Sequence, residues 1–133
     1  MKIYLCSRYS RRQELVGVRE ELLRRGHTVT SRWLDTAWEE KDGTGSSAAP
    51  AEYREEFAIN DMVDVMKADC LIAFTEGERS GSRGGRHVEF GIALARGLHL
   101  IIVGTPENLF HHHPRVKQFD TVESAMKSLE RNP

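Results

Sequence analysis

The sequence predicts an α/β fold, with one parallel sheet of about five strands and helices on both of its faces. Short apolar runs alternate along the chain with segments of helical periodicity. This alternation is typical of parallel strands that are joined by right-handed helical crossovers. The length of 133 residues suits one domain spanning residues 1–133, and no internal repeat divides the chain.

Each expected element carries its own pattern or boundary signal. Strands are short apolar or alternating runs, whereas helices repeat apolar residues every three or four positions. Ser10 is the expected N-cap of the first helix, and Gly26 and Gly97 are stop signals for the first and third helices. The elements are, in order, a strand at Lys2–Cys6, a helix from Ser10 to about Arg25, a strand at His27–Trp33, a helix from about Glu52 to Lys67, a strand at Asp69–Phe74, a helix from about Gly85 to Arg96, a strand at His99–Val103, a strand around Lys117–Phe119 and a helix from about Val122 to Glu130.

Residues 40–51 interrupt this alternation with a stretch rich in glycine, serine and alanine. The stretch is too long for a simple connection, so we expect a flexible loop or lid.

Composition narrows the classes of function. The net charge of -1, from 19 basic and 20 acidic residues, argues against non-specific nucleic-acid binding. No signal peptide or membrane span is visible, so we expect a cytoplasmic protein. Cys6 and Cys70 lie in apolar strand patterns and are expected to be buried free thiols. Local arginine clusters would suit a small anion: Arg8, Arg11, Arg12, Arg79, Arg83 and Arg86.

The segment Thr75–Glu89 joins a buried strand to a helix through a loop of glycine, serine and arginine. Free N–H groups and the positive end of the helix dipole make such a junction an anion cradle. We place Glu89 in the first turn of that helix, where the dipole would keep it ionised. The alternative is a flexible polar loop followed by a carboxylate that the dipole merely favours.

The helix over residues 52–67 carries a second carboxylate of interest. Its stripe of Ile59, Met62, Val63 and Met66 is expected to face the core. Asp61 then points away, between Phe57 and Val65, and apolar neighbours there indicate a cleft or a subunit interface rather than open water. The alternative is a solvated surface aspartate.

Asp61 and Glu89 are therefore expected to meet at the carboxyl edge of the sheet, where α/β proteins bind ligands. Paired carboxylates cleave glycosidic bonds, one as nucleophile and the other as proton donor. Glu89, held anionic, suits the nucleophile, and Asp61, beside Asp64 in an apolar setting, suits an acid with a raised pKa.

In these segments the chain resembles the nucleoside 2-deoxyribosyltransferase family, including its 2′-deoxynucleoside 5′-phosphate N-hydrolase branch. The resemblance rests on Ile3–Cys6, on Asn60–Met62 running to Asp69, and on Gly85–Ala93, which is similar to the family's Gly-x-x-x-Glu-Leu-Gly-x-Ala signature. It implies a single flavodoxin-like (Rossmann-like) domain, a nucleophilic Glu89, and an Asp61 that orients the sugar or protonates the base.

The resemblance also implies where a substrate would bind. In the hydrolase branch a serine ahead of the glutamate holds the 5′-phosphate, and Ser80 and Ser82 lie a residue or so out of that register. The first strand leads into Ser7–Arg12 where the family often has a Gly-rich turn. The extra arginines favour a phosphorylated substrate. The expected substrate-binding residues are Tyr4, Ser7, Arg8, Tyr9, Ser80, Ser82, Arg83, Gly85, Arg86 and Asn108.

Two further expectations concern partners. Consecutive histidines at 111–113 cannot easily converge on one ion, so we expect a surface or interface loop, no metal and no other cofactor. A neighbouring subunit often completes the site in this family, so we expect a homodimer or higher homo-oligomer in which Asn108–His113 can reach a partner's pocket.

The leading hypothesis is an enzyme that releases the base from a (deoxy)nucleoside 5′-monophosphate through Glu89. The first alternative is a nucleoside 2-deoxyribosyltransferase, which passes the sugar to another base instead of to water. An NAD-type glycohydrolase and a non-catalytic nucleotide-binding sensor are further alternatives. The sensor would not need both Asp61 and Glu89.

Overall fold

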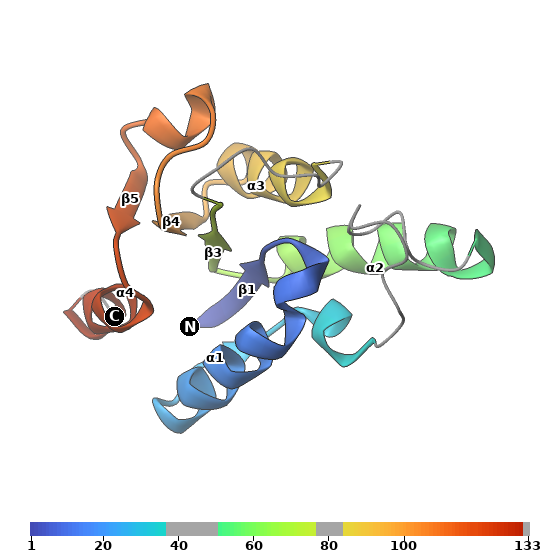
Figure 1. The fold of residues 1–133 in the computed structure, drawn as a ribbon, viewed down its shortest axis with the longest axis horizontal. Helices are drawn as coiled ribbons and strands as arrows, with labels where there is room; N and C mark the ends of the chain where they lie inside the picture. The colour runs from blue at the N-terminus through green and yellow to red at the C-terminus, as the bar shows by residue number, and fades with distance from the viewer. Residues whose placement is uncertain (37–50, 77–83, 132–133) are drawn as a thin grey trace.

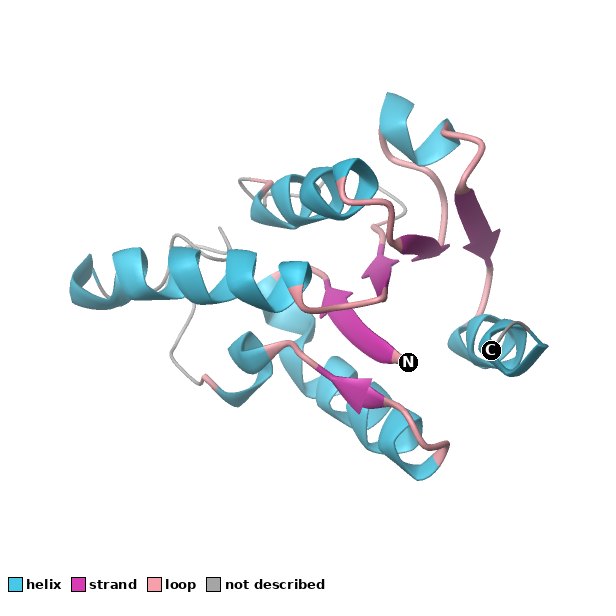
Figure 2. Cartoon of the chain, turned by 180° about the vertical axis from the view of Figure 1, so that it is seen from behind, coloured by secondary structure: helices cyan, strands magenta, loops and turns pink. Residues whose placement is uncertain are grey.

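The computed structural model describes residues 1–36, 51–76 and 84–131. It is a single α/β domain with the flavodoxin-like architecture that the sequence predicted. Five strands form one sheet in the order β2-β1-β3-β4-β5, and each neighbouring pair is parallel. The strands are β1 (Lys2–Cys6), β2 (Thr28–Val29), β3 (Cys70–Phe74), β4 (His99–Val103) and β5 (Val116–Phe119). Figure 2 shows β2 beside β1 at one edge of the sheet.

Helices cover both faces of the sheet because strand residues alternate between two apolar clusters. One cluster holds Ile3 and Leu5 with side chains of α1 (Arg12–Arg24) and α4 (Val122–Arg131). The other holds Tyr4 and Cys6 with side chains of α2 (Arg54–Met66) and α3 (Gly85–Ala95). In Figure 1, α1 and α4 lie below the strands, and α2 and α3 lie above and to the right. In the described part of the chain, no helix has the length and apolar character needed to cross a bilayer.

The second strand is shorter than expected. Only Thr28–Val29 pairs with β1, and Arg32–Asp35 forms a short 3-10 helix, η2. Side chains replace the sheet ladder there: the amide of Leu5 donates to Ser31 Oγ at 2.7 Å, and the Trp33 indole donates to the Leu5 carbonyl at 2.9 Å. These bonds satisfy the edge of β1 without a continuing strand.

The start of α1 also differs from the prediction that Ser10 caps it. Residues Tyr9–Arg11 form a 3-10 turn, η1, and the α-helix begins at Arg12 without a side-chain cap. Gly26 adopts φ 89° directly after the helix, as its stop signal indicated. The expected loop at 40–51 lies outside the described residues apart from Ala51, which begins the 3-10 turn η4 (Ala51–Tyr53).

The orientation predicted for the helix over 52–67 is wrong. Val65 is fully buried, whereas the expected core residues Ile59, Met62 and Met66 are 54%, 48% and 42% exposed. The fourth member of the expected stripe, Val63, is half-buried. Apolar residues occupy both faces of α2, so periodicity alone did not identify the buried one. The face that carries Asp61 turns towards the sheet and α3, and the longer apolar stripe faces outward.

Candidate active site

The site centres on a contact between β1 and α3. Tyr4 lies in the middle of β1 with no exposed surface, on the side of the sheet that α2 and α3 cover. Its hydroxyl donates a hydrogen bond to Glu89 Oε2. Burial, followed by the charges of Glu89 and Asp61, raises the pKa of the Tyr4 phenol well above its ordinary value. Tyr4 therefore keeps its proton and acts as a donor to the carboxylate.

Glu89 does not lie where the sequence placed it. Helix α3 begins at Gly85, after Gly84 with φ 90°, so Glu89 is in the second turn and not in the first. The helix dipole is weak at that depth. Burial and then the Asp61 charge raise the pKa of Glu89 from 4.5 to about 8, although the Tyr4 hydrogen bond lowers it. The expectation that the helix terminus holds Glu89 anionic is therefore wrong, because burial raises its pKa to about 8.

Asp61 reaches the same place from α2, which packs against α3. Its side chain is half-buried. Burial and then the neighbouring Asp64 charge raise the pKa of Asp61 from 3.8 to about 7, and Arg32 acts in the opposite direction. The expected proton affinity of Asp61 is thus supported by the structure. The expected cause is also present, since burial and Asp64 are the two contributions that raise it.

The Asp61 charge raises the pKa of Glu89, and the charges of both carboxylates raise the pKa of Tyr4, so the two carboxyl groups interact. Because the pKa of Glu89, about 8, lies above that of Asp61, about 7, Asp61 loses its proton first, and the pair then holds one proton. One member can then act as a base or nucleophile while the other donates a proton. The site can therefore support acid–base and nucleophilic chemistry.

A band of charge lies beside this pair at the carboxyl ends of β1, β3 and β4. Glu76 follows β3 and contacts Arg11 at 2.9 Å and Arg8 at 3.6 Å. Arg86, in the first turn of α3, is 7% exposed, and one of its NH groups donates to Glu107 at 2.8 Å. Among the described residues, the Nε of Arg86 has no hydrogen-bond partner. The structure thus brings Arg8 and Arg86 to the expected edge, each with a carboxylate.

The ends of β3 and β4 approach each other closely where this band forms. Gly104 follows β4 with φ 119°, and a Cβ there would lie 2.3 Å from the hydroxyl of Thr75. No other residue fits that position without movement of Thr75. Gly104 therefore fixes the start of the loop that carries Glu107.

Of the remaining expected binding residues, some make hydrogen bonds within the chain and others are not described by the structure. Ser7 donates its hydroxyl to the neighbouring Arg8 carbonyl at 2.8 Å, and Tyr9 donates to the Thr36 carbonyl at 2.9 Å. Gly85 is the first residue of α3. Ser80, Ser82 and Arg83, the centre of the predicted cradle, lie outside the described residues.

Asn108 is turned towards its own chain. Its side-chain oxygen accepts from the amides of Phe110 and His111 and caps the 3-10 turn η5 (Leu109–His112). Its Nδ2 lies 3.3 Å from His87 Nδ1. His111 is 4% exposed and accepts the Glu107 amide at 2.9 Å, and burial lowers its pKa. The expected surface loop is thus partly buried. Within the described ranges, no group of three or more candidate ligands is arranged to hold a metal ion.

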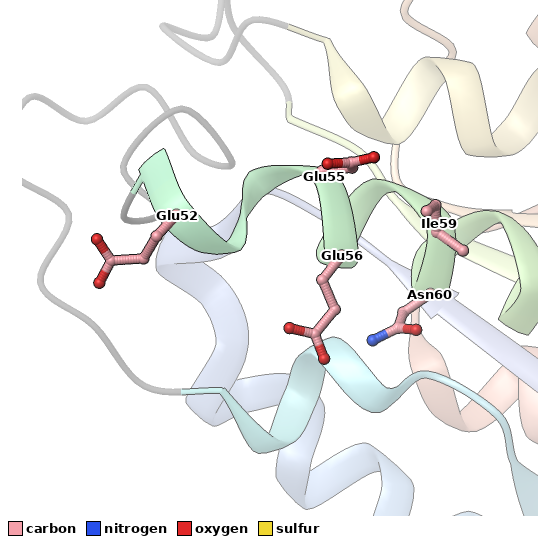
Figure 3. A pocket seen from close by; sticks show the side chains of 5 residues that line it. All are labelled: Glu52, Glu55, Glu56, Ile59 and Asn60. Carbon is pink, nitrogen blue, oxygen red and sulfur yellow. The ribbon is translucent and has the colours of Figure 1, made fainter.

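An open acidic hollow lies on the N-terminal half of α2. Figure 3 shows Glu56 and Asn60 pointing to one side of the helix and Glu55 to the other. Glu52 and Ile59 complete the lining. Because three carboxylates surround it, this hollow does not suit a phosphate group.

Sequence reasoning missed two ion pairs, one beside Asp61 and one in the band of charge at the carboxyl ends of the strands. Asp64 is 2% exposed, and it contacts both the backbone and the guanidinium of Arg32. Glu107 pairs with Arg86. The spacing of Asp64 one turn after Asp61 was visible in the sequence, but its partner lies 32 residues away and follows from the tertiary fold.

Comparisons with known proteins support the fold. No family model and no curated protein matches the sequence. Among solved structures, the chain is similar to the Clostridium botulinum CMP N-glycosidase BcmB, with a TM-score of 0.60 and 16% sequence identity. The similarity covers 98% of this chain and 99% of that chain. At this identity, the likeness establishes a shared architecture over the whole domain.

Proposed function

We propose that this protein cleaves the N-glycosidic bond of a (deoxy)nucleoside 5′-monophosphate and releases the free base and a sugar phosphate. The observation that carries the proposal is the cluster of Tyr4, Asp61 and Glu89 on the side of the sheet that α2 and α3 cover. A structural neighbour of the same architecture, described as a CMP N-glycosidase, adds support. The resemblance of residues 85–93 to the deoxyribosyltransferase signature points to the same chemistry.

The reactive form in this proposal has Glu89 ionised and the proton on Asp61, which is the minor arrangement of the free pair because the pKa of Glu89, about 8, lies above that of Asp61, about 7. In that form, Glu89 attacks the anomeric carbon of the sugar through Oε1, because Tyr4 holds Oε2. The bond between the anomeric carbon and the base nitrogen breaks as Asp61 gives its proton to the departing base. The resulting glycosyl ester is then hydrolysed: water attacks the same carbon, Glu89 leaves as a carboxylate, and Asp61 takes the proton from water. Each cycle returns both carboxyl groups to their starting states.

Substrate recognition in this proposal comes from the arginine-rich edge. Arg8 and Arg86 lie there in the structure, and Ser80, Ser82 and Arg83 follow from the sequence. Arginine suits phosphate because its planar group donates two parallel hydrogen bonds. We expect the 5′-phosphate to replace Glu76 as the partner of Arg8, or Glu107 as the partner of Arg86.

The experiment is incubation of the protein with nucleosides, nucleoside 5′-monophosphates, their deoxy forms and NAD, with chromatography of the released base. Release from monophosphates in water supports the proposal. Release only when a second base is present favours the transferase, and release of nicotinamide from NAD favours the glycohydrolase. Binding without release from any substrate in the panel would leave the nucleotide sensor as the better account.

A further inference from the structure

The segment between β2 and the end of η2 is bonded both to β1 and to α2. On the β1 side, Leu5 donates to Ser31 and accepts from Trp33, directly beside Tyr4. On the α2 side, Thr30 donates its hydroxyl to the Asp64 carbonyl at 2.8 Å. This segment therefore connects the strand that carries Tyr4 with the helix that carries Asp61.

Arg32 and Asp64 form the strongest link in this connection. The backbone amide of Arg32 donates to Asp64 Oδ2 at 3.0 Å, and its Nε donates to Oδ1 at 2.9 Å. The NH2 group lies 2.9 Å from Oδ1. The side chain of Asp64 is 3% exposed, whereas that of Arg32 is 52% exposed, so the carboxylate is fixed and the cation meets solvent. Backbone and bidentate side-chain contacts together hold one geometry.

We propose that Arg32 and Asp64 are a positioning pair for the two site carboxyl groups. The pair holds the turn of α2 that carries Asp61 against the end of β1. It also sets the electrostatic potential at Asp61 and Glu89. The buried Asp64 carboxylate lies one helical turn from Asp61, and the half-exposed Arg32 guanidinium on η2 contacts that carboxylate. In the proposed reaction neither residue touches the substrate, so each acts through Asp61 and Glu89.

Among the residues that the structure describes, the charged and titratable groups that act on Asp61 and Glu89 come from four elements. They are Tyr4 and Cys6 on β1, Arg32 on η2, Asp64 on α2, and the two carboxyl groups themselves on α2 and α3. Tyr4 and Cys6 have pKa values raised by burial and are neutral near pH 7. Substitution of Arg32 or Asp64 therefore changes the charge near Asp61 and Glu89 while leaving the two carboxyl groups themselves in place.

The two members of the pair have opposite effects on proton affinity. Asp64 raises the pKa values of Asp61 and Glu89, and Arg32 lowers that of Asp61. Removal of the Arg32 charge should therefore move the titration to higher pH, and removal of the Asp64 charge should move it to lower pH. If the pair had only a structural role, loss of either partner would break the same contact, and both single variants would shift the titration in the same direction.

The test is a carbon-13 NMR titration of the carboxyl groups in the substrate-free protein. The variants are Arg32→Gln, Asp64→Asn, the double variant and Arg32→Lys, with Arg19→Gln as control. Arg19 pairs with Asp35, also on η2, at 2.8 Å, but that pair is absent from the contributions to the Asp61 and Glu89 pKa values. The expected midpoint shift of Asp61 is up by about half a pH unit to one unit in Arg32→Gln and down by a similar amount in Asp64→Asn.

The double variant should return close to the wild-type midpoint, and Arg32→Lys and Arg19→Gln should not shift it. Shifts in the same direction in both single variants, or no shift in either, would overturn the proposal. If Arg32→Gln does not fold, Asp64→Asn and Arg32→Lys decide the question by the same criteria.

The consequence for turnover rests on the proposed function: the pH profile of base release should move with the NMR midpoints. The two claims can fail separately. Absence of base release in the wild type would refute the proposed function, while the titration would still decide the role of the pair.

Discussion

The Tyr4 hydroxyl donates its hydrogen bond to Glu89 Oε2 from the centre of the neighbouring strand. The bond ties one carboxylate oxygen to a rigid sheet and leaves the other for chemistry. It also opposes the burial that raises the pKa of Glu89. The geometry therefore assigns Tyr4 to the orientation and ionisation of Glu89, whereas the sequence led us to expect it among the substrate-binding residues.

Tyr4→Phe should keep the packing of β1 and lose this hydrogen bond. The pKa of Glu89 should rise, and the acidic limb of the pH profile of kcat should move to higher pH. At pH 7 we expect kcat to fall about tenfold or more, which corresponds to one charge-assisted hydrogen bond. Steady-state kinetics over pH measure this, with Tyr53→Phe, at an exposed tyrosine of η4, as the matched control. Equal pH profiles for Tyr4→Phe and the wild type would remove Tyr4 from this role.

The raised pKa values also predict how stability depends on pH. The folded chain binds protons at Glu89 and Asp61 more tightly than the unfolded chain, because both pKa values lie above 4.5 and 3.8 when folded. Stability should therefore fall as pH rises from about 4 to about 8. Glu89→Gln should reduce this slope and be more stable than the wild type at pH 8. Urea unfolding at several pH values measures it, and an unchanged slope would contradict the raised pKa of Glu89.

Asp61→Asn should lower kcat more than it weakens substrate binding, because proton donation acts in the transition state. The loss should be greatest for bases that are poor leaving groups. Comparison of kcat and KM over a series of bases measures this. An effect on KM alone, with kcat unchanged, would reassign Asp61 to positioning of the sugar.

Arg83→Ala, Ser82→Ala and Arg86→Ala should each reduce the preference for monophosphates over the matching nucleosides. The expected reduction is about tenfold for an arginine, since one charge-assisted contact is lost. Glu107→Gln provides the complementary change, because it removes the carboxylate that holds Arg86. Competition between a monophosphate and its nucleoside measures the ratio, and equal use of both by the wild type would favour a nucleoside substrate.

The outward stripe of α2 changes the expected dimer surface but not the expectation of a homodimer. Ile59, Met62 and Met66 are exposed, and so is Val88 on the neighbouring α3 at 65%. These exposed apolar side chains suit a symmetric contact on the outward face of α2. Met62→Lys should weaken association, unlike Lys127→Glu on α4. Light scattering of a fully active wild-type monomer at assay concentration would rule this out.

The order of elements was predictable because it depends on local pattern. The family resemblance named Asp61 and Glu89, and the structure brings them close enough for the Asp61 charge to act on Glu89. Buried parallel strands are continuous apolar runs, and the α3 signature is contiguous in the sequence. The orientation of α2 was not predictable. Its two apolar faces have similar periodicity, and the choice between them depends on what packs against each.

Other features failed for reasons that lie outside local sequence. The β2 strand ends early because Ser31 and Trp33 bond to Leu5, which only the folded sheet brings near. Glu89 is a different case: α3 begins at Gly85, as the sequence predicted, and counting from that start places Glu89 in the second turn. The pairs Arg32–Asp64 and Arg86–Glu107 join residues that are distant in sequence.

The central claim is that Glu89 is a nucleophile, and trapping of the glycosyl enzyme tests it most directly. The protein would be quenched during turnover of a slow substrate, such as a 2-fluoro-substituted deoxynucleoside 5′-monophosphate, and digested for mass spectrometry. We expect the mass of the sugar phosphate on the peptide that contains Glu89, with no adduct in Glu89→Gln and at least a thousandfold lower base release in that variant. An adduct on another residue, or near-wild-type turnover by Glu89→Gln, would contradict the account.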